Sequence, residues 1–146
     1  MKRFDLPYGR GTISLSLPER RVKAVLESHL HTYHPDLGEE ELVNAALESP
    51  EGSPRLSQLA KGKHNVVMIA SDHTRPVPSR HIIPAMLREI REGNPEADIT
   101  ILIATGCHRA PTREELIQKF GEEIAGREKI VIHSCEDSED FVSLGT

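Results

Sequence analysis

Apolar and polar residues alternate along the first part of the chain. In TISLSLP (residues 12–18) every second residue is apolar, and a Gly-Arg-Gly turn separates this segment from FDLPY (4–8). Alternation with a period of two around a glycine turn predicts a β-hairpin with one buried face. Because the alternation resumes over residues 22–26, which favours another short strand, we expect a β-rich lead-in over residues 1–27.

Three short apolar runs, rich in β-branched residues, occur later in the chain. They are VVMIA (66–70), DITILIA (98–104) and KIVIH (129–133). Continuous apolar runs of this length are typical of strands in a parallel sheet. We therefore expect the first two to be buried strands, VVMIA on both of its faces.

Amphipathic segments precede and separate these runs. EEELVNAALE (39–48) and PRLSQLAKG (54–62) predict two short helices. Apolar residues recur at helical spacing over residues 83–90, and since proline breaks a helix interior, this helix is expected to begin only one or two residues before Pro84. TREELIQKFG (112–121) predicts a helix with a capping box at its start and a glycine at its end.

The order of these elements predicts the fold class. Strand, helix, strand, helix and strand follow one another over residues 64–146. This order implies right-handed crossovers and a three-layer α/β core, a Rossmann-like parallel sheet with flanking helices, preceded by the N-terminal β-hairpin. A length of 146 residues suits a single domain.

Composition narrows the classes of protein. The net charge is −5 and aromatic residues make up only 3%, so the chain lacks the basic face and the stacking platforms that bind nucleic acid. Its longest apolar runs, of about five residues, are far short of the ~20 that span a bilayer. No secretory signal opens the chain, and its two cysteines form neither a CxxC pair nor a disulfide framework. We expect a soluble, cytoplasmic protein with no nucleic-acid or membrane partner.

Two polar loops follow the first two predicted strands. SDHTRPVPSRH (71–81) comes directly after VVMIA, and TGCHRAPT (105–112) comes directly after DITILIA. In parallel sheets, ligands bind outside the carboxyl ends of the strands. The tips of these two loops are therefore expected to face each other at one rim of the sheet.

The first loop is built to hold an arginine in place. Pro76 and Pro78 stiffen the backbone around Arg75 and keep it extended. The guanidinium fork of arginine matches a carboxylate or a phosphate bidentately. In the alternative interpretation, Asp72 and Arg75 only pair with each other or cap the helix that follows Ser79.

The second loop contains the candidate acid–base group. Gly106 permits a positive φ or a close approach to a ligand, and His108 is the residue of either loop best suited to proton transfer near neutral pH. The alternative is a surface histidine near a helix N-terminus. Cys107 is a poor nucleophile candidate because neighbouring residues at a strand end point apart.

A histidine cluster, HLHTYH (29–34), is the one candidate metal site in the sequence. His29 and His31 share a face if the chain is extended there, but no second pair of ligands accompanies them. We interpret His29, His31 and His34 as structural or solvated histidines, and expect no metal site in this chain.

The two polar loops also resemble a known family. SDHTRPVPSRHIIPAML and ATGCHRAPTREEL are similar to segments of the lactate racemase family, the nickel-pincer-nucleotide-dependent 2-hydroxyacid racemases and epimerases. The DHTRPVP and TGCHR motifs in this order are specific to it. The resemblance extends to LPYGRGTISLSLPE, ALESPEGSPRLSQLAKG and EDFVSLGT, and so covers nearly the whole chain.

The resemblance implies a role for each loop residue. Arg75 corresponds to the arginine that holds the substrate carboxylate, with Asp72 beside it. Asp72, His73, Thr74 and Arg75 would line the cofactor. His108 corresponds to one of two acid–base histidines on opposite faces of the substrate. In the family mechanism a histidine takes the hydroxyl proton while the C2 hydride moves to the pyridinium ring of the cofactor.

Other functional residues of the family have no counterpart here. Its second catalytic histidine, the lysine attached to the cofactor and the nickel-ligating histidine all come later in its sequences. We therefore expect residues 1–146 to be the substrate- and cofactor-facing N-terminal domain of a longer racemase or epimerase, an isomerase that acts on a small 2-hydroxyacid. The nickel-pincer nucleotide would be anchored mainly by the C-terminal domain, and the isolated chain would be inactive.

Three functions stay open at this point. The first is the racemase domain. The second is a non-catalytic α/β module that binds a carboxylate or a phosphate through Arg75. The third is an interaction domain in which both polar loops are inert. The identity of the 2-hydroxyacid and the presence of a homo-oligomer are left open by the resemblance.

Overall fold

Two structural units make up the chain, Met1–Asp36 and Leu37–Thr146. The computed structural model describes residues 1–137, 139, 141–143 and 145, with the backbone alone at residue 31. Part of the terminal motif EDFVSLGT and the side chain of His31 therefore lie outside the described residues.

The first unit contains the predicted hairpin. Strand β1 (Lys2–Tyr8) pairs antiparallel with β2 (Gly11–Leu17), and Tyr8 lies opposite Gly11. The loop between them has two residues, and Gly9 takes a φ of +56° there. A positive φ at the first loop residue is what a type II′ hairpin turn requires, and glycine adopts it without strain.

Two expectations for the lead-in are wrong. Within the first unit the apolar face of the hairpin is not buried: Leu6, Ile13 and Leu15 are 43–53% exposed, because the two strands of this unit form a single layer. Residues 22–28 form no strand, since no neighbouring strand pairs with them. The regular elements after the hairpin are two short 3₁₀ helices, η1 (Glu19–Arg21) and η2 (His29–Thr32).

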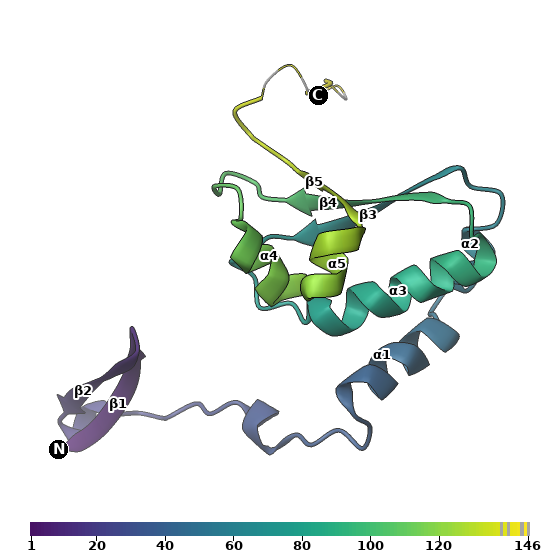
Figure 1. Cartoon of the computed structure of the whole chain (residues 1–146). Coiled ribbons are helices and arrows are strands. Elements are labelled where there is room, and N and C mark those ends of the chain that lie inside the picture. The colour runs from purple at the N-terminus through teal and green to yellow at the C-terminus, as the bar shows by residue number, and fades with distance from the viewer. Residues whose placement is uncertain (138, 140, 144, 146) are drawn as a thin grey trace. The chain divides into compact units, whose positions relative to one another are not determined.

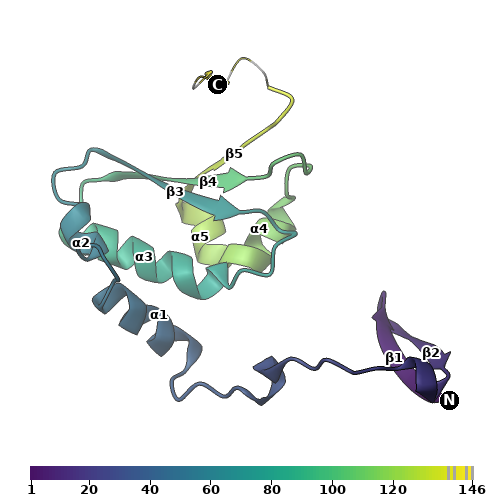
Figure 2. The same ribbon diagram turned by 180° about the vertical axis from the view of Figure 1, so that it is seen from behind.

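The second unit is a parallel sheet with helices packed against it, as expected for the α/β fold class (Figures 1 and 2). The three strands are adjacent in the order β3-β4-β5 and all run parallel. In chain order the elements are α1 (Glu39–Glu48), α2 (Leu56–Leu59), β3 (Asn65–Ser71), α3 (Ser79–Gly93), β4 (Asp98–Ala104), α4 (Arg113–Phe120), α5 (Glu122–Arg127) and β5 (Lys129–Ile132).

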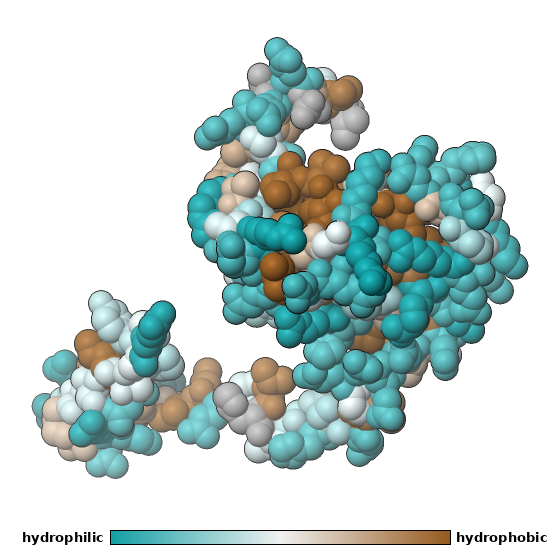
Figure 3. Space-filling view, viewed as in Figure 1, coloured by the Kyte–Doolittle hydropathy of each residue, from teal (hydrophilic) through white to brown (hydrophobic). Residues whose placement is uncertain are grey.

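All of these helices lie on one face of the sheet (Figures 1 and 2). The strands follow one another across the sheet, and crossovers of one hand that step in one direction place their helices on the same side. On the opposite face, Val67, Ile69 and Val131 are 59%, 74% and 44% exposed, and Figure 3 shows hydrophobic residues gathered over the strands. For the described residues, the expected third layer and the burial of VVMIA on both faces are wrong.

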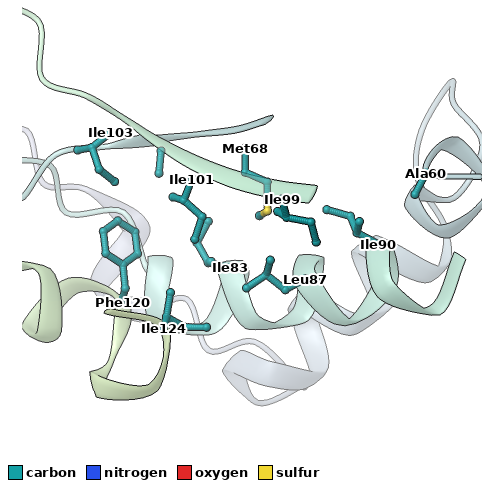
Figure 4. Close-up of a cluster of buried hydrophobic side chains, with 11 residues drawn as sticks. Ala60, Met68, Ile83, Leu87, Ile90, Ile99, Ile101, Ile103, Phe120 and Ile124 are labelled. Atoms are coloured by element: carbon teal, nitrogen blue, oxygen red, sulfur yellow. The ribbon is translucent and has the colours of Figure 1, made fainter. Parts of the chain in front are cut away.

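The core fills the space between the sheet and its helices (Figure 4). In β4 every second residue points into it, so Ile99, Ile101 and Ile103 are at most 5% exposed. From the helical side the core receives Ile83, Leu87 and Ile90 of α3, Phe120 of α4 and Ile124 of α5.

Helix α3 begins earlier than its proline suggests. It starts at Ser79 and continues through Pro84, not one or two residues before it. Pro84 removes one helical hydrogen bond because it has no N–H to donate to the carbonyl of Arg80. Burial of Ile83 and Leu87 on either side of the proline offsets that cost.

Both ends of helix α4 are as predicted, but a further helix follows it. The capping box is confirmed: Thr112 Oγ1 accepts from the N–H of Glu115, and a Glu115 carboxylate oxygen accepts from the N–H of Thr112. Gly121 ends α4 with a φ of +90°. Helix α5, which follows at once, was not predicted, because six residues are too few to display a helical period.

The close approach of α2 to α3 depends on Gly93. A Cβ atom at this position would lie 1.8 Å from the carbonyl oxygen of Ser57. We predict that Gly93→Ala destabilises the fold by about 1–3 kcal/mol, because the backbones must separate. Gly126 of α5 is the matched control, since its Cβ would have no neighbour within 4 Å. Gly126→Ala should be neutral or stabilising by up to ~1 kcal/mol.

Urea unfolding of the two variants checks this prediction. The midpoint should fall for Gly93→Ala alone. Equal midpoints in the two variants would contradict the tight contact between α2 and α3.

Candidate functional site

The two polar loops begin side by side at the carboxyl edge of the sheet. Ser71, the last residue of β3, lies opposite Ala104, the last residue of β4. Each loop then turns back at once: the N–H of Arg75 donates to the carbonyl of Asp72 at 3.3 Å, and that of His108 donates to the carbonyl of Thr105 at 3.0 Å. The expectation that these loops meet at one rim is confirmed.

A buried carboxylate joins the two loops. Asp72 is 2% exposed, and its Oδ2 lies 2.5 Å from Nδ1 of His108, a side chain that is 44% exposed. Oδ1 of Asp72 accepts from the hydroxyl of Thr74 at 2.6 Å and from the N–H of Thr74 at 2.9 Å. The hydrogen bond from the Thr74 hydroxyl, and next that from His108, hold the pKa of Asp72 far below its usual range, although burial opposes this.

This contact decides the orientation of the histidine. With a carboxylate as its partner, Nδ1 of His108 is assigned as the protonated nitrogen that donates to Asp72. Nε2 has no hydrogen-bond partner in the described part of the chain and is then the basic nitrogen. The alternative in which Asp72 pairs with Arg75 does not match this arrangement, because both carboxylate oxygens of Asp72 are bonded to Thr74 and His108.

Arg75 is held by its backbone and leaves its side chain exposed. Its N–H donates to Asp72, and its carbonyl accepts from Nζ of Lys119 at 3.0 Å. No ion pair or hydrogen bond involves its guanidinium group within the residues that the structure describes. Arg75 lines a surface pocket together with Lys119 and Arg80. Two histidines, His73 and His81, and two glutamates, Glu39 and Glu115, also line this pocket, so it contains charged groups of both signs.

His73 and Thr74, which lie between Asp72 and Arg75, contact other side chains of the protein. Nε2 of His73 lies 3.6 Å from a carboxylate oxygen of Glu115, and the His73 side chain is 17% exposed. Thr74 uses its hydroxyl on Asp72. Nδ1 of His73 is buried and has no hydrogen-bond partner among the described residues. Of the four residues for which the resemblance implies cofactor contact, His73 and Arg75 thus keep an unengaged polar group, and the Arg75 residue is exposed.

Glu115 connects the two loops, a role that the sequence did not reveal. Its carboxylate accepts two hydrogen bonds from the guanidinium of Arg109, at 2.6 and 2.8 Å, while it caps α4 and contacts His73. The hydrogen bond from Arg109, followed by that from the backbone of Thr112, lowers the pKa of Glu115 to about 2. The pattern from Thr112 to Glu115 predicts the capping role alone. The position of Glu115, one helical turn before Lys119 on the same face of α4, is the signal in the sequence for its wider role.

The remaining candidates do not come together as a site. Cys107 and Cys135 are both exposed and free, and partial desolvation, followed by the effect of the neighbouring Cys107, raises the pKa of the Cys135 thiol. Among the described side chains, which do not include His31, no three potential metal ligands gather. Within the same residues, no helix is both long and apolar enough to cross a membrane.

Comparison with known proteins identifies the family of the chain. A family profile described as "Lactate racemase N-terminal domain" matches residues 8–146. The chain belongs to the lactate racemase family. Within the family it is 47% identical to the lactate racemase of Lactiplantibacillus plantarum over 145 residues, and 44% identical to that of Thermoanaerobacterium thermosaccharolyticum over 146 residues. These alignments cover 99% and 100% of the chain, but 34% of each relative.

Solved structures agree with the family assignment. The lactate racemase apoprotein from Thermoanaerobacterium thermosaccharolyticum superposes with a TM-score of 0.85 at 43% identity, covering 99% of this chain and 33% of that chain. A protein from Thermotoga maritima, 22% identical with a TM-score of 0.52, is similar in fold alone over 68% of this chain and 22% of its own. The chain spans about a third of the length of the lactate racemases that it matches.

The charge on Glu115 makes the stability of the site depend on pH. Glu115→Gln keeps a group that can cap α4 but removes the ion pair with Arg109. The pKa of Glu115, about 2 in the folded state, is below the unfolded value near ~4.3. Its contribution to stability is therefore present above about pH 4.3 and is lost as the pH falls toward 2.

We predict that Glu115→Gln lowers the midpoint of chemical unfolding at pH 7 and that the two curves converge as the pH approaches 2. The control is Glu123→Gln, which removes only an exposed ion pair with Arg127. A difference between Glu115→Gln and the wild type that stayed constant from pH 7 to pH 2 would show that the ion pair is not its source.

Proposed function

We propose that this chain supplies the substrate clamp and one acid–base group of a 2-hydroxyacid racemase or epimerase. The hydrogen bond between Asp72 and His108 is the observation that carries the proposal. It orients the ring, and in the part of the chain that the structure describes, Nε2 of His108 and the guanidinium of Arg75 at the same rim have no hydrogen-bond partner. These are the groups needed to move a proton at one end of a 2-hydroxyacid and to hold the other.

His108 is the proton acceptor in this proposal. Nε2 takes the proton of the substrate hydroxyl and returns it when the alcohol is re-formed. Asp72 acts through His108, because its buried carboxylate holds the ring in the tautomer that keeps Nε2 basic and stabilises the imidazolium that forms. Thr74 completes this arrangement by occupying the other oxygen of Asp72.

Arg75 binds the substrate carboxylate. Its guanidinium can donate two parallel hydrogen bonds to the two carboxylate oxygens, which fixes the position of C2 as well as the charge. Arg75, Arg80 and Lys119 line the pocket together with two glutamates, Glu39 and Glu115, so the side chains that are always cationic outnumber the carboxylates and favour an anion at this rim. A neutral substrate would gain nothing from these groups.

Racemisation also requires transfer of the hydrogen on C2, and the family resemblance assigns that chemistry to a nickel-pincer nucleotide, which accepts and returns a hydride when bound. Asp72 and Thr74 already bind protein groups, whereas the guanidinium of Arg75 and the buried Nδ1 of His73 have no hydrogen-bond partner among the described residues. The side chains present therefore fit contact with such a cofactor through Arg75 and His73 more than its anchorage. We place the anchoring residues in the remaining two thirds of the lactate racemases.

A non-catalytic module that binds a carboxylate or a phosphate is the second candidate. The free guanidinium of Arg75 supports it equally well. The Asp72–His108 pair favours the racemase, because binding an anion requires no oriented basic nitrogen.

The role of Arg75 is tested by Arg75→Ala in the full-length racemase. Loss of a charge-assisted hydrogen-bond pair, worth about 1.5–3 kcal/mol, should raise the KM for D- and L-lactate about 10- to 100-fold. Arg88→Ala is the matched control, since this exposed arginine of α3 contacts Asn44 away from the rim. An unchanged KM in Arg75→Ala would remove the clamp from the proposal.

The role of His108 is tested by His108→Ala in the same protein. Removal of a general base should lower kcat for lactate interconversion about 10²- to 10⁴-fold. The interconversion is measured by chiral chromatography. His64→Ala, an exposed histidine just before β3, should leave kcat unchanged. A rate within about threefold of wild type in His108→Ala would contradict acid–base catalysis and favour the binding module.

A further inference from the structure

Helix α4 contacts both loops of the site. On the side of the first loop, Glu115 lies near His73, the carbonyl of Ile117 accepts from the Arg80 side chain at 3.3 Å, and Lys119 binds Arg75. On the side of the second loop, Glu115 holds Arg109. The helix follows the second loop directly in the chain, so it ties the position of the first loop to that of the second.

Lys119 makes the contact closest to the substrate clamp. Nζ of Lys119 donates to the backbone carbonyl of Arg75 at 3.0 Å. The lysine is partly buried, and this burial lowers the pKa of its ammonium group, while the charge of Asp72 opposes the shift. No carboxylate pairs with this ammonium group in the part of the chain that the structure describes, and it is directed to a main-chain oxygen.

Two hydrogen bonds restrain the backbone of Arg75, in addition to the stiffening that Pro76 and Pro78 provide. Pro76 follows it and cannot donate a hydrogen bond, so the turn lacks one of its backbone donors. The N–H of Arg75 is bound to Asp72, and its carbonyl is bound to Lys119. Both polar backbone groups of Arg75 are thus fixed while its guanidinium group stays free, which is the preorganisation that a binding side chain needs.

We propose that Lys119 is a positioning residue that holds Arg75 in place for the substrate carboxylate, with α4 as the rigid support that sets the distance from Arg75 to His108. This inference rests on the proposed function. Lys119 acts through the backbone of Arg75 and does not touch the substrate. A misplaced guanidinium binds a carboxylate with one hydrogen bond in place of two, so affinity for the substrate falls while proton transfer by His108 persists.

The test is Lys119→Met in the full-length racemase, because methionine keeps most of the aliphatic stem and removes the ammonium donor. We expect the KM for lactate to rise about three- to tenfold, with kcat within about twofold of wild type. Lys119→Arg, which retains donors, should recover most of the affinity. Lys129→Met is the control, since Lys129 pairs with Asp98 at the other end of the sheet and should leave both constants unchanged.

A double-mutant cycle separates positioning from direct contact. In the Arg75→Ala background, Lys119→Met should cause no further rise in KM, because nothing is left to position. The same rise in both backgrounds would overturn the proposal and indicate that Lys119 touches the substrate or acts through general stability. Amide hydrogen exchange supplies a second measurement: a peptide spanning residues 72–80 should exchange faster in Lys119→Met, and an unchanged rate would also overturn the proposal.

Failure of the proposed function would look different. In that case the wild-type protein would not interconvert the enantiomers of any 2-hydroxyacid. If the wild type is active and Lys119→Met keeps the wild-type KM, the positioning role alone is wrong.

Discussion

Strands β3 and β4 are parallel and end at the same level of the sheet. The contact between Asp72 and His108 at the carboxyl edge depends on that geometry. β3 and β4 pair from Asn65 with Asp98 to Ser71 with Ala104. The next residues, Asp72 and Thr105, therefore open two loops at neighbouring points. A shift of the register by one residue would point these side chains to the other face of the sheet and separate the carboxylate from its histidine.

Burial of a carboxylate next to a half-exposed histidine is costly unless every oxygen has a partner. The chain meets this requirement with Thr74 and His108. Around this pair, Glu115 satisfies Arg109 and the N-terminus of α4. The result is a rim in which the charged groups hold one another in place, while Nε2 of His108 and the guanidinium of Arg75 make no hydrogen bond within the described residues.

Local patterns predicted much of this arrangement. Apolar runs located all three strands of the parallel sheet, and the motif at Thr112 identified the start of α4. The two motifs of the family resemblance pointed to Arg75 and His108, and the parallel topology explained why their loops meet. Each of these signals is a local sequence pattern within about a dozen consecutive residues.

The features that sequence did not reveal depend on contacts between distant segments. The start of α3 before Pro84 is favoured by packing against the sheet, which outweighs the local cost of proline. One carboxylate oxygen of Asp72 binds Thr74 and the other binds His108, which lies on a different loop from Asp72. The uncovered face of the sheet follows from the strand order, which an apolar run such as VVMIA does not encode.

That uncovered face has a consequence for the behaviour of the chain in solution. Val67, Ile69 and Val131 expose apolar area that adheres to any apolar surface within reach. A net charge of −5 opposes such contact only by long-range repulsion, which salt screens. Raising the ionic strength shortens the range of that repulsion, so at high salt this face of the 146-residue chain has less electrostatic protection against apolar contacts.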